Sequence, residues 1–159
     1  MFELLTATYA ADEFDLRADW DLRRQAWSGH EYRILREVSN TDFLQGVALL
    51  ATREARQAFL KANNDGERAP RIGCRRADIL AMPLDAYQRW ADALTLGFRR
   101  AAKVLHQHYM LETKYLPYGA QLIPLASALA LLDAKEIETA GAQRKISRWL
   151  WCGIFGELY

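Results

Sequence analysis

Seven apolar residues recur at alternating spacings of three and four in the middle of the chain, and this pattern limits the fold more than any other. They are Leu84, Tyr87, Ala91, Leu94, Phe98, Ala101 and Leu105. This spacing places all of them on one face of an α-helix, so it predicts a long helix that follows Pro83. The seam favours packing along an antiparallel helix of the same chain. An intermolecular coiled coil is the alternative, although it usually sustains more repeats with charged flanks.

Apolar periodicity also predicts helices on both sides of this segment. They cover residues 2–11, 16–27 with a C-cap at Ser28–Gly29, 40–61 with N-cap oxygens at residues 40–42, 122–132, and from about residue 142 onward. Residues 31–38 are ambiguous, and residues 67–74 carry a proline and a glycine without periodicity, which is typical of an exposed loop.

Composition agrees with a helical fold. The chain holds 25 Ala and 23 Leu but only 3 Val and 7 Ile, and the first two residue types lose little entropy in a helix whereas the last two suit a sheet. At 159 residues, with 51% apolar and 26% charged residues, the chain is long enough for one core and too apolar for disorder. We therefore predict an all-α, single-domain bundle of about six helices over residues 1–159.

The cysteines and the chain start bear on the compartment. Cys74 and Cys152 are the only cysteines and lie 78 positions apart, which excludes a zinc ribbon and a disulfide framework. No secretory signal begins the sequence, so we expect a cytoplasmic protein. Residues 115–132 are uncharged but contain two prolines, and we expect a buried helix there rather than a membrane span.

The motif search predicts neither a catalytic residue nor a cofactor or metal. The glycine-rich phosphate loops and the Gly-x-Ser-x-Gly turn of a nucleophilic serine are absent. His106 and His108 would point about 200° apart on a helix, too far for one metal ion. Cys74, beside Arg75 and Arg76, is the one candidate for a reactive thiol, and a half-buried structural thiol is the alternative.

Basic side chains are the candidate binding residues. Net charge is +1, but residues 1–42 hold five basic and nine acidic side chains, residues 43–108 hold eleven and six, and residues 109–159 hold five of each. Guanidinium and ammonium groups contact phosphates, so nucleic-acid binding and simple ion pairing are both open. The candidates are Arg68, Arg71, Arg75 and Arg76 in the loop, and Arg99, Arg100 and Lys103 on the long helix. Trp149, Trp151 and Phe155 could stack on a ligand, although at their spacing such residues more often fill core or interface.

Four strings of the sequence together resemble one family. They are FELLTA (2–7), NTDFLQ (40–45), LPYGAQLIPL (116–125) and RWLWCGIFGELY (148–159). With them the chain resembles the helical region of the domain-of-unknown-function 262 family, to which the amino-terminal half of GmrSD-type modification-dependent restriction enzymes is similar. The last string is the most specific of the four.

The resemblance implies a supporting role. In that family the helical region follows a ParB/sulfiredoxin-like α/β domain whose Asp-Gly-Gln-Gln-Arg-type motif is implicated in nucleotide hydrolysis, and many members carry an HNH-like nuclease region. This sequence contains neither, so no family catalytic residue transfers to it. The resemblance implies a non-catalytic module of a restriction or anti-phage defence protein that gives scaffold, domain docking or DNA contact.

The uncapped start at residue 2 and the closing string at Tyr159 lead us to expect a fragment of a longer multidomain protein. Its partners would be the missing domains of the parent polypeptide, a second copy in a homodimer, and DNA in the full-length context. We expect an exposed apolar patch near the first and last helices. The alternative is a self-contained DNA-binding or protein-interaction bundle.

Overall fold

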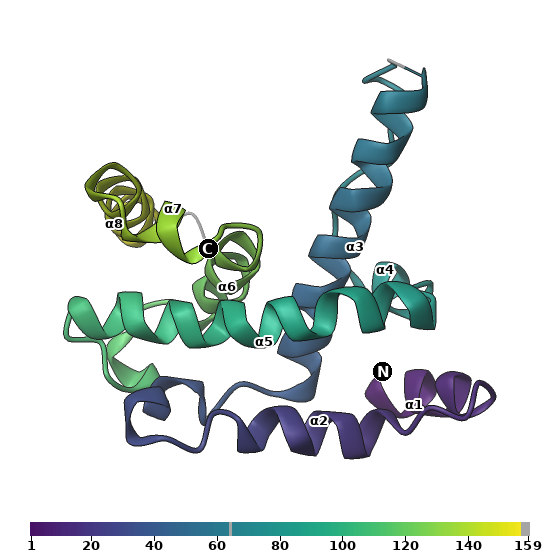
Figure 1. Ribbon diagram of the computed structural model, residues 1–159, viewed down its shortest axis with the longest axis horizontal. Coiled ribbons are helices and arrows are strands. Elements are labelled where there is room, and N and C mark those ends of the chain that lie inside the picture. The colour runs from purple at the N-terminus through teal and green to yellow at the C-terminus, as the bar shows by residue number, and fades with distance from the viewer. Residues whose placement is uncertain (64, 157–159) are drawn as a thin grey trace.

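Helix α5 (Leu84–Gln107) is the axis against which the other elements pack (Figure 1). The computed structural model describes residues 1–63 and 65–156, and these residues form helices and loops without a strand. Besides α5, the longer helices are α1 (Phe2–Ala10), α2 (Leu16–Gln25), α3 (Asn40–Asn63), α6 (Leu122–Ala130) and α8 (Ala140–Phe155). The all-α prediction is confirmed, and the described chain has six α-helices of nine residues or more.

Short elements join these helices. They are the 3-10 helices η1 (His30–Leu35), η2 (Thr113–Tyr115) and η3 (Gly119–Gln121) and the α-helices α4 (Arg76–Leu80) and α7 (Ala134–Glu138). η1 occupies the segment that was ambiguous from its sequence, and α7 was not predicted. None of the described helices combines the length and hydropathy needed to cross a bilayer.

The seam of α5 is buried as predicted, but its partner differs from the prediction. Six of the seven seam residues are buried and Leu84 is partly buried. Instead of one antiparallel helix, α6, α3 and η1 each pack on part of α5, and α2 lies alongside it in the same direction (Figure 1). The seam is therefore divided among several short partners.

Two glycines allow α3, α5 and α6 to meet closely. A Cβ atom on Gly97 of α5 would lie 2.3 Å from the carbonyl oxygen of Ala126 in α6. A Cβ atom on Gly46 of α3 would lie 2.7 Å from Cδ2 of Leu94 in α5. At Gly97 the clash is with backbone atoms, so this crossing requires glycine, whereas at Gly46 the side chain of Leu94 would have to shift.

Aromatic rings fill the space between α2, α3 and α5. The ring centroids of Trp27 and Phe98 are 5.2 Å apart, and those of Trp20 and Phe43 are 5.5 Å apart. Tyr87 closes this cluster toward α1, with its ring 5.8 Å from that of Tyr9. Rings of this size dominate the energetics of a core, so the α2, α3 and α5 junction is its centre.

Two predicted caps are wrong in detail. Helix α2 ends at Gln25 with a right-handed C-cap at Ala26, and Gly29 instead precedes η1. At the start of α3 the Ser39 hydroxyl accepts a hydrogen bond from the backbone amide of Asp42, and the Asp42 carboxylate accepts one from the backbone amide of Ser39. This reciprocal pair is a capping box that begins one residue earlier than the predicted N-cap oxygens.

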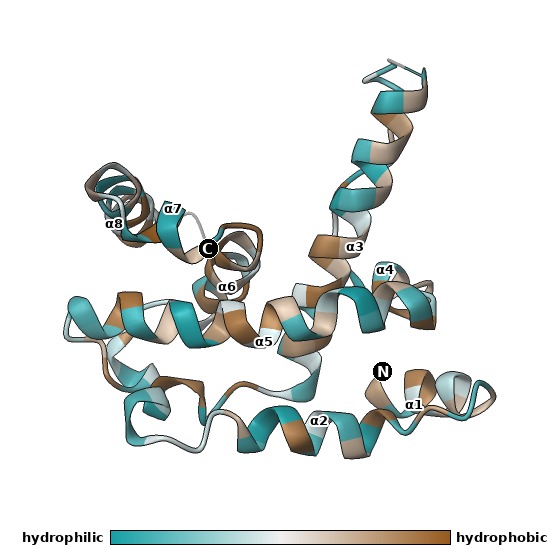
Figure 2. Cartoon of the chain, in the orientation of Figure 1, coloured by the Kyte–Doolittle hydropathy of each residue, from teal (hydrophilic) through white to brown (hydrophobic). Residues whose placement is uncertain are grey.

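The second half of α3 projects from the body of the molecule (Figure 1). No residue of α3 after Leu50 is fully buried, and hydrophilic residues recur along this part (Figure 2). The loop after α3 returns along it. Thr52 Oγ1 lies 3.1 Å from both the amide and the carbonyl oxygen of Gly73, and the Arg56 guanidinium donates to the carbonyl of Ala69 at 3.1 Å.

Candidate functional site

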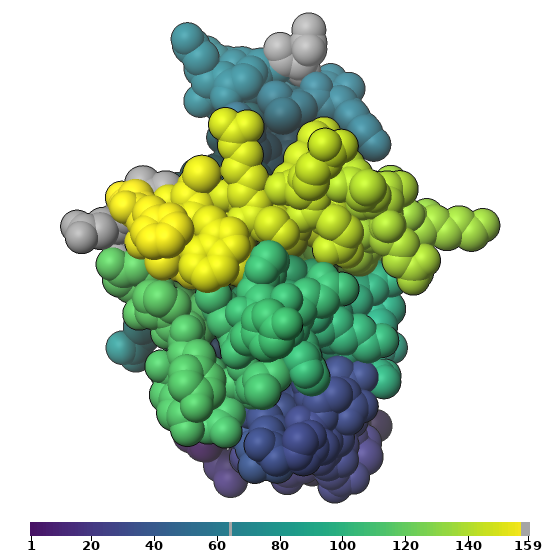
Figure 3. All heavy atoms as spheres, turned by 90° about the vertical axis from the view of Figure 1, so that its left-hand side faces the viewer, coloured from purple at the N-terminus to yellow at the C-terminus, as the bar shows by residue number. Residues whose placement is uncertain are grey.

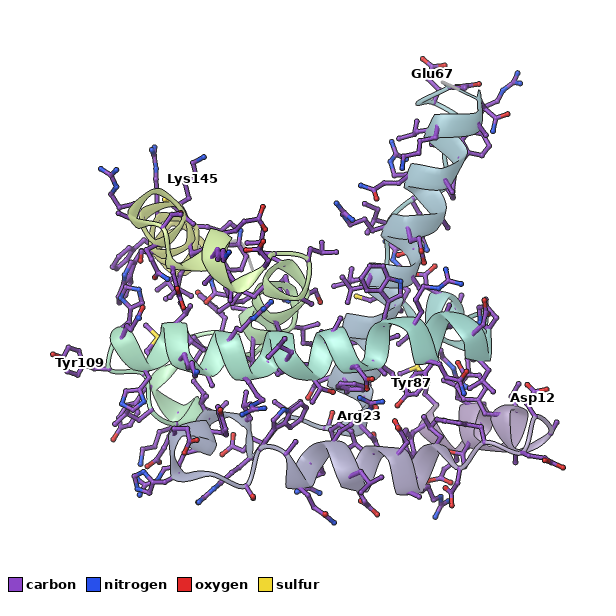
Figure 4. The ribbon with its side chains drawn as sticks, in the orientation of Figure 1. Asp12, Arg23, Glu67, Tyr87, Tyr109 and Lys145 are labelled. Atoms are coloured by element: carbon purple, nitrogen blue, oxygen red, sulfur yellow. The ribbon has the colours of Figure 1, made fainter. Side chains whose placement is uncertain are left out.

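The predicted loop arginines lie on the projecting part of the molecule, which we call the basic arm and define as residues 51–63 and 65–76. Arg68 is 85% exposed, and its nearest acidic partner is Asp65 at 3.6 Å. Arg71 lies 3.6 Å from Asp78, and Arg75 and Arg76 are exposed at the start of α4. Arg68 and Arg71 thus lie in the loop that returns along α3, and Arg75 and Arg76 lie where this loop ends at α4. Glu67 is at the tip of the arm (Figure 4).

The arm also contains three basic residues that the motif search missed: Arg53, Arg56 and Lys61 of α3. They bring the arm to seven basic residues against the acidic Glu54, Asp65 and Glu67. The excess of basic residues in the middle of the chain was the available signal. What the sequence could not reveal is that the loop folds back along the helix and adds its arginines to those of α3.

The predicted basic residues of α5 do not join the arm. Arg99 donates to the hydroxyl of Tyr32 at 3.1 Å and lies 5.2 Å above its ring centroid. Arg100 donates to the carbonyl oxygens of Leu129 at 2.8 Å and Leu132 at 2.5 Å. Arg99 therefore fastens η1 to α5, Arg100 fastens the end of α6, and only Lys103 of this group is exposed without such a role.

A half-buried polar cluster joins α2 to α5 (Figure 4). Arg23 lies 2.7 Å from Asp19 and 2.8 Å from Asp92 and donates to Thr95 at 3.0 Å. The Tyr87 hydroxyl donates to Asp19 at 2.5 Å. Arg23 and Asp19 are largely buried and Asp92 is exposed, but each charged group is paired within the cluster, so the cluster holds two helices together.

The pKa values in this cluster agree with a structural role. Burial and the hydrogen bond to Asp19 raise the pKa of Tyr87 far above its ordinary value. Burial would lower the pKa of Arg23, but its hydrogen bonds to Asp19 and Asp92 outweigh that effect and raise it. Tyr87 therefore stays neutral and Arg23 stays charged throughout the physiological pH range.

The candidate thiol is not activated. Cys74 is partly buried at the base of the arm, and burial, with a smaller contribution from Asp78, raises the pKa of its thiol. A raised pKa lowers the fraction of reactive thiolate at neutral pH. Of the two readings open for Cys74, this geometry favours the structural thiol.

Of the two histidines after the seam, His108 lies near α8, whereas His106 lies beside His30 and Ile34 of η1. Nε2 of His108 is 3.0 Å from the hydroxyl of Ser147, and its ring meets the ring of Trp151 edge-on with centroids 5.8 Å apart. Among the described residues, no three His, Cys, Asp or Glu side chains are grouped so that they could hold a metal ion.

Helix α8 lies at the surface of the molecule (Figure 3) and exposes aromatic side chains. Phe155 is 79% exposed and stacks on Trp151 with ring centroids 5.7 Å apart, and Trp149 is 39% exposed. On α1, at the other end of the chain, Leu4 is 52% exposed. Exposed apolar residues therefore occur on both the first and the last helix, with the larger set on α8.

A shallow groove of about 210 Å³ runs between α6 and α8, and we call it the α6–α8 groove. Its lining is almost wholly apolar and consists of Leu125, Ala128, Leu129, Leu132, Lys145, Ile146 and Trp149. Sequence reasoning identified Trp149 as a core or interface residue, but not the groove, because its two walls are distant in sequence.

Comparison with family models, with curated proteins and with solved structures finds no match to this chain. The fold defines an all-α protein whose accessible features are a basic arm and an apolar groove on α6 and α8. Its function is therefore argued from these two surfaces.

Proposed function

We propose that this chain is a non-catalytic helical module of a GmrSD-like restriction or anti-phage defence protein, and that it docks onto other domains of that protein. The observation that carries the proposal is the apolar surface of α8, where Phe155 is 79% exposed and Trp149 forms one wall of the α6–α8 groove. Exposed apolar surface of this kind marks an interaction site. The four sequence strings that resemble the family supply the identity of the parent.

The paired polar groups fit this role. Arg23 and Arg100 fasten α2 and α6 to α5. In the proposal, nucleotide hydrolysis and DNA cleavage belong to other domains of a cytoplasmic parent, and this chain carries neither cofactor nor catalytic residue.

Co-purification tests the docking role. The α/β domain encoded by the parent gene would be expressed with an affinity tag together with the present chain, and the chain should be retained. Phe155→Ser should reduce retention, because it removes an exposed ring from α8. Tyr109→Ser, which removes a ring that is 87% exposed on the loop after α5, is the matched control and should leave retention unchanged.

Two results would overturn the docking role. One is a parent gene that encodes no strand-rich segment with an Asp-Gly-Gln-Gln-Arg-type motif. The other is hydrolysis of a nucleotide or cleavage of DNA by the purified chain alone, since the proposal assigns that chemistry to other domains.

The basic arm favours a second candidate function, direct contact with DNA. Seven basic residues against three acidic ones project from the body, and Arg76 has no ion-pair partner among the described residues. Protein cations that neutralise phosphates release counterions, so such binding weakens steeply with salt.

Fluorescence anisotropy with a labelled DNA duplex over a salt series tests this candidate. The double variant Arg75→Ala/Arg76→Ala should weaken binding about equally for different sequences and make the slope of log K against log salt shallower by about 1 to 2. Arg24→Ala/Arg36→Ala removes the same charge from exposed positions outside the arm and should change binding little. Absence of binding even at low salt would rule the candidate out.

A further inference from the structure

We propose that the α6–α8 groove binds an acidic amphipathic helix, whose apolar side chains enter the groove while its carboxylates pair with Lys145 and Arg148. This inference rests on the proposed docking role and specifies the chemistry of the segment that docks.

The groove has the shape for a helix. On the α6 side its lining residues are Leu125, Ala128 and Leu129 of the helix and Leu132 just after its end. The spacings of three and four place the three helical residues on one ridge of α6, and Leu132 extends the apolar wall beyond the helix. A partner helix laid along this ridge would present apolar side chains with the same spacing, as in other helix-in-groove complexes.

The volume favours a protein side chain over a small molecule. The groove holds about 210 Å³, whereas pockets that bind drug-sized ligands hold roughly 300 to 1,000 Å³. The lining also lacks converging polar groups that would orient a small ligand, since Lys145 is its only charged member. One or two apolar side chains of a partner are the better match.

The charged residues of the two helices that form the groove have one sign. Helix α8 contains Arg144, Lys145 and Arg148 and no acidic residue, and α6 contains no charged residue. In the described part of the chain none of the three makes an ion pair, and Lys145 projects away from the body (Figure 4). Brown, hydrophobic residues cover most of α6 (Figure 2), so a complementary partner is apolar on one face and acidic beside it.

The nearest acidic residues do not neutralise this charge. Asp133 and Glu136 lie at the start of α7. The Asp133 carboxylate accepts a hydrogen bond of 2.7 Å from the backbone amide of Glu136, and the Glu136 carboxylate accepts one of 2.8 Å from the backbone amide of Asp133. This capping box holds both carboxylates at α7. The basic residues of α8 therefore remain available to a partner.

A labelled synthetic peptide is the probe. It would place Leu along one face of a helix and Glu elsewhere, and a control peptide would carry Lys in place of Glu. Fluorescence anisotropy with the whole chain should show binding of the acidic peptide and at least roughly tenfold weaker binding of the basic one, since unlike charges at a rim attract and like charges repel.

Two pairs of variants locate the binding. Ala128 is exposed in the groove, so Ala128→Phe should fill the groove and abolish binding, while Ala7→Phe adds the same ring to an exposed position on α1 and should not. Lys145→Glu/Arg148→Glu should weaken binding at least roughly tenfold, because the charge reversal replaces two attractive ion pairs by repulsion. Lys61→Glu/Arg68→Glu makes the same charge change on the basic arm and should alter binding less than twofold. All four variants change the surface only, and circular dichroism would check that each variant is folded.

Several outcomes would overturn the inference. They are equal binding of the basic peptide, no effect of Ala128→Phe, equal weakening by the two charge-reversal variants, and a homodimer of the chain that Ala128→Phe disrupts, which would place a second copy in the groove. Loss of peptide binding with intact co-purification would refute this inference alone. Intact peptide binding without co-purification would refute the docking role alone.

Discussion

Gly97 is the residue at which α5 and α6 approach most closely. Any side chain there would meet the backbone of α6, with a Cβ atom 2.3 Å from the Ala126 carbonyl oxygen and 3.1 Å from the Ala130 amide nitrogen. Backbone atoms cannot rotate aside as a flexible side chain can, so the two helices would have to separate. The conformational cost of a glycine inside a helix is accepted at this position because contact between the helices requires it.

Gly97→Ala should therefore destabilise the fold by about 1 to 3 kcal/mol, the usual cost of overpacking, despite the better helix propensity of alanine. Gly141→Ala is the matched control, because a Cβ atom on Gly141 in α8 would meet nothing within 4 Å. It should stabilise by up to about 1 kcal/mol. Urea unfolding followed by circular dichroism measures both free energies, and a neutral or stabilising Gly97→Ala would contradict the crossing of α5 and α6 described above.

The thiols should differ in reactivity. Since burial and Asp78 raise the pKa of Cys74, its thiolate fraction at neutral pH is small, and a disulfide reagent at pH 7 should label it more slowly than the exposed Cys152. The labelling rate of Cys74 should keep rising as the pH passes the ordinary pKa of a thiol. Single Cys74→Ala and Cys152→Ala variants separate the two rates, and rapid labelling of Cys74 at pH 7 would restore the possibility of a reactive thiol.

Among the elements, the joint between α1, α2 and α5 is held by tyrosines as much as by apolar rings. The Tyr87 hydroxyl donates to Asp19 of α2, and the Tyr9 hydroxyl donates to the carbonyl of Met82, just before α5, at 3.0 Å. Burial raises the pKa of both tyrosines, with Asp19 adding to the effect at Tyr87 and Asp85 at Tyr9. The folded state thus disfavours ionisation of both.

Alkaline pH should loosen this joint. In the folded state both tyrosine pKa values lie above the ordinary value near 10, so the unfolded chain ionises first as the pH rises. The contribution of the two tyrosines to the free energy of unfolding is therefore complete below pH 10 and is lost above it. The free energy of unfolding should fall by about 1.4 kcal/mol per pH unit for each tyrosine.

Tyr87→Phe separates this effect from general alkaline denaturation. It should cost about 1 to 2 kcal/mol at pH 7, through loss of a hydrogen bond to a charged group, and make the decline above pH 10 shallower. Tyr109→Phe, at an exposed position, should change neither quantity. Chemical unfolding between pH 7 and 11 measures the slopes, and parallel slopes for the wild type and Tyr87→Phe would contradict this assignment.

Periodicity predicted the elements better than their partners. The seam identified α5 because local spacing alone decides which residues share a helix face. It could not show that α2 lies alongside α5 in the same direction, since that depends on Trp27, Phe98 and their neighbours meeting in three dimensions. Pro124 lies in the first turn of α6, where a helix tolerates proline.

The candidate surfaces were predictable to different degrees. The loop arginines were found because they are adjacent in sequence. Arg99 and Arg100 were expected to form one basic strip, but consecutive helix residues point about 100° apart, and tertiary packing directs one to η1 and the other to α6. The α6–α8 groove arises only when two distant segments pack together, and no local pattern contains that information.

Across the whole molecule, burial is graded from α5 outward. Helix α5 has nine buried residues, whereas α8, which is 16 residues long, buries only Leu150 and Gly153. Regions with few buried contacts open with lower free energy than the core does. Helix α8, which carries the surface that we assign to docking, is therefore also the least firmly attached of the long helices.

Amide hydrogen exchange should reveal this gradient. In the free chain the amides of α5 should exchange most slowly, those of the buried first half of α3 should follow, and those of α8 should exchange much faster. The acidic peptide should slow exchange in α8 and leave α5 unchanged, because a bound helix stabilises the α6–α8 groove by mass action. Mass spectrometry of peptic fragments resolves these segments. Equal protection of α5 and α8 in the free chain would contradict the graded burial, and slowing confined to the basic arm would place the peptide on the wrong surface.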